Sequence, residues 1–164
     1  MKKHLAALIA SIALAFNAFA QTTIAAPWVR ATVPRQTASG AYLQVRSADT
    51  ARLVAAYSPL AASVQFHKME MNGQMMKMRE VDAIDLPAGS TVNFASGGYH
   101  LMLSSLKRQL KEGDVVPLSL VIERKKGRRE TIVVNVPVKP LTYAGTAGIS
   151  AGISAGTSAD PVHH

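Results

Sequence analysis

Residues 63–81 read SVQFHKMEMNGQMMKMREV, and this stretch decides the fold class. Two runs of alternating side chains, Ser63 to Met69 and Met75 to Val81, flank the turn dipeptide Asn72-Gly73. Alternation with a period of two is typical of strands, and an Asn-Gly pair favours a tight turn between them. The stretch therefore predicts β-structure.

The chain on either side, as far as residue 143, has the same character. Short β-runs alternate with glycine and proline turns, and no helical period persists for longer than a turn or two. Strands are expected at residues 28–32, 41–46, 52–57, 63–69, 75–81, 91–95, 99–103, 116–123 and 130–138. Many short strands at this spacing predict one all-β domain, a sandwich or a barrel, over residues 21–143.

The N-terminal segment has the features of an export signal. Two lysines precede an apolar run from Leu5 to Phe16, and Ala18-Phe19-Ala20 supplies the small-x-small pattern of a signal peptidase site. We expect residues 1–20 to be a signal peptide cleaved after Ala20, which places the mature protein in the periplasm; the alternative is an uncleaved anchor with the same orientation. The apolar run is shorter than the roughly 20 residues that cross a bilayer, so no transmembrane span is expected in the mature chain.

Charge and cysteine content narrow the possible functions. The formal net charge is +8, but the basic residues are spread along the chain, which does not favour dedicated nucleic-acid binding. The sequence has no cysteine. Because an oxidising compartment tends to lock thiols into disulfides, any redox-metal chemistry here must use other ligands.

Methionine and histidine are concentrated in two segments. Five of the seven methionines lie between residues 69 and 78, directly after His67, and another, Met102, lies beside His100. Methionine used as a flexible gap-filler in a core would be scattered along every strand. The clustering therefore indicates a separate cause.

Strand alternation shows which of these side chains share a face. His100 and Met102 point one way, whereas Leu101 and Leu103 point the other way and are expected in the core. In the earlier segment His67 projects with Gln65 and Met69, opposite to Val64 and Phe66, and Met76 projects with Met78. This geometry nominates His67, His100 and Met102, together with one or two of Met69, Met71, Met76 and Met78.

The chemistry of these side chains points to copper(I). A thioether is a soft, neutral donor that prefers Cu(I), and imidazole accepts several metals. A histidine alone, or a methionine-rich strand alone, is usually structural. Both kinds of residue on the same two segments, without any cysteine, favour a copper site.

The spacing of four residues resembles a known motif. His67, Met78, His100 and Met102 are separated by ten, twenty-one and one residues, which matches the copper-binding motif of the PCuAC-type periplasmic copper chaperones. The resemblance covers roughly residues 22–139 and extends to the flanking segments 26–31, 76–78, 97–103 and 110–114.

This resemblance implies a fold, a site and a partner. The fold is a cupredoxin-like Greek-key β-sandwich, and the site holds one Cu(I) per domain near the surface with His67, Met78, His100 and Met102 as ligands. The implied partner is a copper acceptor, such as a cytochrome oxidase subunit or its assembly factor. The chain departs from many relatives at Lys68, where they have methionine; alternation sends Lys68 to the other face, so little effect on the site is expected.

Other functions are weighed against this one. A copper-dependent envelope enzyme is disfavoured, because four protein ligands leave no open position on the metal and no acid or base lies beside the motif. A hydrolase is disfavoured, because Ser63 and Ser104 have no nucleophile elbow or ordered triad around them. We therefore expect no enzymatic activity. A protein that sequesters copper uses the same site as a chaperone, and this alternative stays open.

The C-terminal segment, residues 144–164, is rich in glycine, alanine and serine and offers almost nothing to bury, so it is expected to be disordered. It ends in His163 and His164. These two histidines are a candidate weak Cu(II) site, and the alternative is an inert end.

Overall fold

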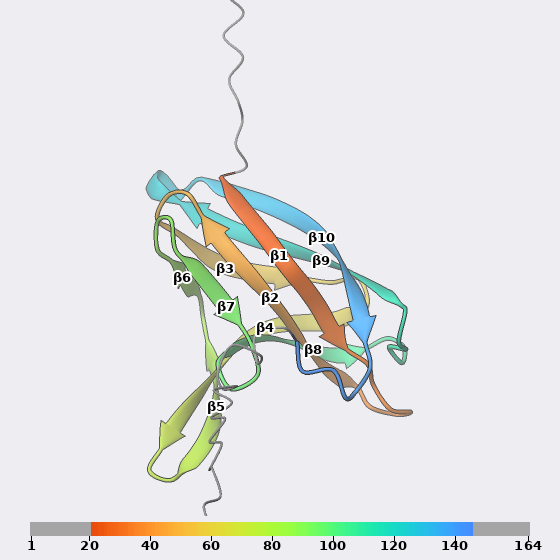
Figure 1. Ribbon diagram of the computed structural model, residues 1–164. Helices are drawn as coiled ribbons and strands as arrows, with labels where there is room; N and C mark the ends of the chain where they lie inside the picture. Colours follow the sequence, from red (N-terminus) through yellow and green to blue (C-terminus); the bar gives the residue numbers. More distant parts are fainter. Residues whose placement is uncertain (1–20, 146–164) are drawn as a thin grey trace, which may run out of the picture.

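The computed structural model describes residues 21–145, where the chain forms ten strands and one short 3-10 turn (Figure 1). The all-β prediction is confirmed. Residues 1–20 and 146–164, with the predicted signal peptide and the candidate Cu(II) site, lie outside the described residues. Within 21–145, no helix has the length and apolar character that crossing a membrane requires. The elements are β1 (Thr22–Arg30), β2 (Ala38–Ser47), β3 (Ala51–Tyr57), β4 (Ala61–Asn72), β5 (Met75–Val81), β6 (Ile84–Leu86), β7 (Thr91–Phe94), β8 (Tyr99–Leu106), β9 (Val115–Arg124), η1 (Lys125–Gly127) and β10 (Arg129–Lys139).

The strand pairing closes into a barrel. Starting from β4, hydrogen-bonded neighbours follow in the order β8, β2, β1, β10, β9 and β3, and β3 pairs with β4 again at Ala56 and Val64. Strand β7 pairs with both β2 and β8. Closure satisfies the edges that an open sheet would leave unpaired. The Greek-key, cupredoxin-like arrangement in particular stays a prediction.

The barrel interior is filled by every second residue of the strands. In β9, Val116, Leu118, Leu120 and Ile122 are fully buried, whereas the residues between them are partly exposed. Each large aliphatic side chain removed from water stabilises the fold by about 1.5–3 kcal/mol. Leu101 belongs to the same core, as the alternation in its segment predicted.

Two strands differ most from the sequence-based expectation, and several others, such as β4, extend up to three residues beyond their predicted bounds. Strand β1 begins at Thr22 rather than at residue 28, because a bulge between Ala25 and Trp28, with Ala26 at φ 45°, interrupts the alternation. Strand β6 was not predicted, because it has only three residues and lies beside the Pro87 turn. It pairs with β3 and buries Ile84 and Leu86.

The predicted turn at Asn72-Gly73 joins β4 and β5 into a hairpin that projects from the barrel (Figure 1). Asn72 pairs with Met75 across the turn, and Gly73 has φ +64°, a conformation that favours glycine. All of β5 except Val81 is exposed. The hairpin therefore adds little to the core, and its side chains are available for other purposes.

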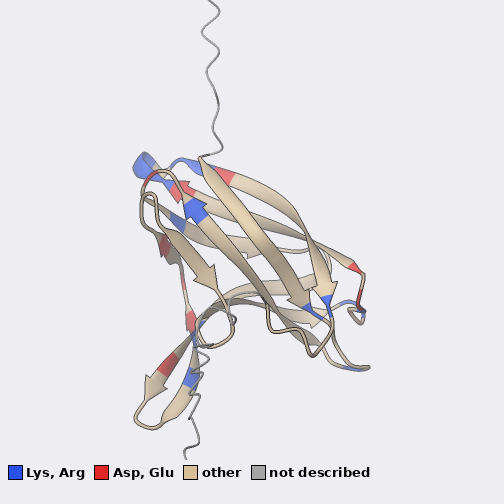
Figure 2. Ribbon diagram, in the orientation of Figure 1, with Lys and Arg blue, Asp and Glu red and all other residues tan. Residues whose placement is uncertain are grey.

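Charged side chains gather at another tip of the molecule. The predicted charged hairpin between β9 and β10 is the η1 turn, whose lysines lie at the end of the barrel where β1 begins (Figure 2). None of its residues is buried. This agrees with a solvated turn.

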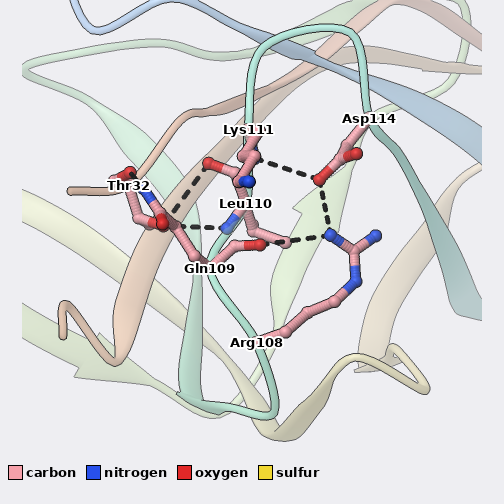
Figure 3. A network of polar contacts seen from close by, with 6 residues as sticks. All are labelled: Thr32, Arg108, Gln109, Leu110, Lys111 and Asp114. Carbon is pink, nitrogen blue, oxygen red and sulfur yellow. Dashed lines mark hydrogen bonds and ion pairs between the residues drawn. The ribbon is translucent and has the colours of Figure 1, made fainter. Parts of the chain in front are cut away.

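A small polar network fixes the connection from β8 to β9 (Figure 3). The Leu110 amide donates to the Thr32 hydroxyl at 2.9 Å, while the Leu110 side chain is fully buried. The Asp114 carboxylate accepts hydrogen bonds from the Lys111 amide and the Arg108 guanidinium. These bonds, the Lys111 amide first, lower the pKa of Asp114. The loop that starts β9 is thereby held in one conformation.

Arg124 at the end of β9 is the most buried cation of the ion pairs in the described part of the chain. Its side chain is 7% exposed, and its guanidinium donates to Glu130 at 2.6 Å and to the Thr22 hydroxyl at 2.8 Å. This side chain therefore ties the start of β1 to the β9–β10 hairpin. The nearby Arg129–Glu123 pair joins the same two strands, but its arginine is 65% exposed.

We predict that Arg124→Met lowers the free energy of unfolding by about 1–3 kcal/mol, because it removes charge-assisted hydrogen bonds from a buried position. Arg129→Met is the matched control and should change it by less than about 1 kcal/mol, as is usual for exposed pairs. Urea denaturation of both variants measures the difference. Equal losses would contradict the importance of burial at Arg124.

Candidate metal centre

The pairing of β4 with β8 places the two candidate histidines side by side. His67 lies directly opposite His100, and the next pair on the same face is Gln65 with Met102. The two imidazole rings are 5.6 Å apart between centroids and nearly perpendicular. His100 is buried at 7% exposure, while Met102 is partly buried. Histidines 33 positions apart in the sequence thus share one patch on the outer face of the barrel.

Strand β5 adds a methionine to these histidines. In the β4–β5 ladder Met69 faces Met78, which is the next pair on the same face after His67 and Glu80. The Met78 side chain turns back toward β8, so that its Sδ lies 3.3 Å from Nε2 of His100. The alternation left several methionines open as candidates, and the structure brings Met78 into contact with a histidine.

A glycine turn orients the His100 ring. The Gly98 amide donates to the Ala95 carbonyl at 3.0 Å, with Gly97 at φ +87°, and β8 begins directly afterwards. The Gly98 carbonyl oxygen then lies 3.4 Å from Nδ1 of His100 and accepts from the Met69 amide at 3.1 Å. An imidazole that donates from Nδ1 to this carbonyl keeps the Nε2 lone pair directed at Met78, where a metal would bind.

Burial keeps His100 in the form that binds metals. The pKa of His100 is lowered from its ordinary value, mainly because burial penalises the imidazolium; the Gly98 carbonyl opposes this shift, and the neighbouring His67 adds to it. Since only neutral imidazole is a ligand, a lowered pKa keeps His100 competent at neutral pH.

His67 has an unsatisfied polar atom. Its Nδ1 is buried and finds no hydrogen-bond partner among the described residues. Such an atom normally costs about 1–3 kcal/mol, and in a native structure it calls for an explanation such as an ion. Within residues 21–145, no three His, Cys, Asp or Glu side chains form a metal-binding group. The donors gathered here are imidazole and thioether, which fit a soft ion.

Aromatic residues beside the site were not identified from the sequence. Gly40 of β2 lies opposite Met102, and a Cβ at Gly40 would come within 2.8 Å of the Tyr42 hydroxyl. The Tyr42 ring stacks on Trp28 at 4.3 Å and lies 6.3 Å from the His100 ring. Alternation in β2 shows that Gly40 and Tyr42 share a face, but nothing local shows that β2 lies beside β8.

The remaining candidates lie further away. Met71 pairs with Met76, the next pair on the same face after Met69 and Met78, toward the tip of the hairpin. Lys68 lies on the other face, as expected, with its Nζ 3.2 Å from Glu70 and 5.7 Å from the centre of the Tyr99 ring.

Comparison with known proteins gives a family and several relatives. A family model described as "Putative lipoprotein LpqE-like" matches residues 22–138. A putative lipoprotein of Leifsonia xyli subsp. xyli is 33% identical over 118 residues, which cover 71% of this chain and 69% of that protein.

Solved PCuAC domains share the fold. The Cu(I) form of DR1885 from Deinococcus radiodurans is 32% identical with a TM-score of 0.58, over 76% of this chain and 81% of that one. The copper-bound PCuAC domain from PmoF2 is 29% identical with a TM-score of 0.56, over 73% and 94%. The metal-free PCuAC domain of PmoF2 is 26% identical with a TM-score of 0.61, over 76% of this chain and 94% of that one. The resemblance to PCuAC proteins predicted from the motif is thereby confirmed.

We predict that His100 of the metal-free protein titrates below pH 6.5 in an NMR titration of its ring protons. In the variant His67→Gln its pKa should rise only part of the way back, because burial is the larger cause of the shift and the charge of His67 the smaller. A midpoint above 6.5 in the wild-type protein would contradict the buried, neutral imidazole.

Proposed function

We propose that this chain, which belongs to the LpqE-like family, carries copper(I) and binds one ion through His67, Met78, His100 and Met102. The observation that carries the proposal is the 3.3 Å approach of the Met78 sulfur to Nε2 of His100, beside a second histidine with an unsatisfied ring nitrogen. The likeness to copper-bound PCuAC domains supports the same cargo.

Each ligand type suits this ion. Thioethers are soft and neutral, so they prefer Cu(I) to zinc, magnesium or calcium and release no proton when they bind. They also form no disulfides, which suits the oxidising periplasm where we place the mature protein after removal of residues 1–20. The two imidazoles add stronger donors, and they make the affinity decline at pH values where histidine is protonated.

The position of the site suits delivery. His67, His100 and Met102 lie on the outer face of the barrel wall, and Met78, on the projecting hairpin, is 51% exposed. An acceptor can therefore approach one ligand and exchange it without opening the core. Four protein ligands would leave no open position for a substrate, so we infer a carrier rather than an enzyme. We propose a copper centre of cytochrome oxidase, reached through a subunit or an assembly factor, as the acceptor.

We predict that Met78→Leu and Met102→Leu each weaken the binding of the first Cu(I) equivalent by at least about 10-fold, since even the loss of residues that only orient a metal ligand typically costs 10–100-fold. The free energy of unfolding should fall by less than about 1.5 kcal/mol, because these substitutions conserve side-chain volume. His100→Ala should also bind weakly. Anaerobic competition with a colorimetric Cu(I) chelator measures the affinities, and circular dichroism verifies folding.

Met75→Leu is the control for these variants. Met75 lies on β5 but on the face opposite Met78, and it is 63% exposed. The Met75→Leu variant should bind the first Cu(I) equivalent as tightly as the wild type does. If Met78→Leu and Met102→Leu also bind like the wild type, the ligand assignment is wrong.

Delivery and sequestration make different predictions for copper transfer. A carrier should pass Cu(I) to a metal-free oxidase copper domain within minutes, and faster than the ion dissociates into chelator solution, because transfer proceeds by ligand exchange in a complex. A sequestering protein should transfer no faster than it releases the ion. Stopped-flow measurement at several acceptor concentrations decides, since only direct transfer accelerates with acceptor.

A further inference from the structure

The β4–β5 hairpin separates its side chains by chemistry. Strand alternation and the β4–β5 register place four charged side chains on one face and four of the five thioethers of the hairpin on the other; Met75 lies on the charged face, and Glu80, opposite His67, lies on the thioether face. The charged face holds Lys68, Glu70, Lys77 and Arg79, and the thioether face holds Met69, Met71, Met76 and Met78. Three of these methionines, Met69, Met71 and Met76, supply no ligand to the site described above, and Met71 and Met76 lie furthest from it.

Core packing does not explain Met71 and Met76. They are 63% and 49% exposed, on a hairpin that projects from the barrel (Figure 1). Neither belongs to the hydrophobic core or to the residues packed against it. Exposed apolar side chains bring no burial energy, so their placement in one row calls for another explanation.

The register brings their sulfurs within reach of one ion. Met71 lies directly opposite Met76, and side chains in such a cross-strand pair have Cβ atoms about 4.5–5.5 Å apart. The next pair inward on the same face, Met69 and Met78, lies about 7 Å along the strands. Met69 can therefore contribute to either position with its flexible side chain.

We propose that Met71 and Met76, with Met69, form a second Cu(I) site, made of thioethers alone and one step outward from His100 and Met78. The proposal rests on the proposed function only for the identity of the ion. Copper moves inward by exchanging one thioether for the next, from Met76 to Met78 and then to His100. The ligands are neutral throughout, so neither a proton nor an electron moves with the ion.

The charges of the hairpin fit this role. The lysines and arginine point to the other face, where Glu70 pairs with Lys68 at 3.2 Å and with Arg79 at 3.9 Å. Figure 2 shows the charged positions on the two strands of the hairpin. The thioether face itself carries no cationic side chain between residues 69 and 78, so a monovalent cation meets no adjacent like charge there.

The test is an anaerobic NMR titration of the full chain, labelled with 13C at the methionine methyl groups, with acetonitrile-stabilised Cu(I). We expect the Met78 and Met102 methyl signals to shift to completion with the first equivalent, and those of Met71 and Met76 to shift with the second. The double variant Met71→Leu/Met76→Leu should lose the second equivalent and keep the first. Met75→Leu, equally exposed on the opposite face, should keep both.

The outcomes separate this proposal from the proposed function. If Met71 and Met76 stay unshifted up to three equivalents while Met78 and Met102 saturate, the second site is overturned and the carrier function stands. If Met71 and Met76 shift while Met78 and Met102 do not, the second site stands and the primary ligand assignment fails. Loss of the second equivalent in Met75→Leu would overturn the assignment to one face.

Discussion

The register between β4 and β8 is the constraint on which the site depends. Phe66 pairs with Leu101 inside the barrel, and the neighbouring pair, His67 with His100, faces outward. Because side chains alternate, a slip of β4 by one residue would turn Lys68 toward the site and expose the buried Phe66. The free energy of burying Phe66 and Leu101 therefore also holds the two histidines together, although neither histidine contributes much to the core.

Much of the fold could be predicted from local alternation. The strand at residues 75–81 was predicted with its observed bounds, and the alternation of Leu101 and Leu103 with His100 was confirmed. The bulge at Ala26 and the three-residue strand β6 were missed, because each is too short or too irregular to show a period. Closure of the barrel through β3 and β4 depends on distant pairing, which no local pattern contains.

For the candidate site, the sequence indicated the donor side chains better than the residues that surround them. Clustered histidines and methionines indicated soft-metal chemistry, but alternation did not distinguish Met76 from Met78. The resemblance to the motif selected Met78; this assignment stays a prediction, and the Met78 Sδ lies 3.3 Å from Nε2 of His100. Tyr42 and Gly40 could not be found, because their place beside His100 and Met102 depends on pairing between strands about 60 residues apart in the sequence.

The hairpin beyond Phe66 and Val81 contributes no residue to the core cluster or its packed surroundings. Substitutions between these two residues therefore escape the strict volume and shape demands that govern the barrel interior. Beyond Met69, whose amide bonds to the Gly98 carbonyl, a change in the length or donor atoms of this segment would leave the packing of the barrel interior intact. Ligand binding by the hairpin can thus change independently of the packing that stabilises the fold, within one small domain.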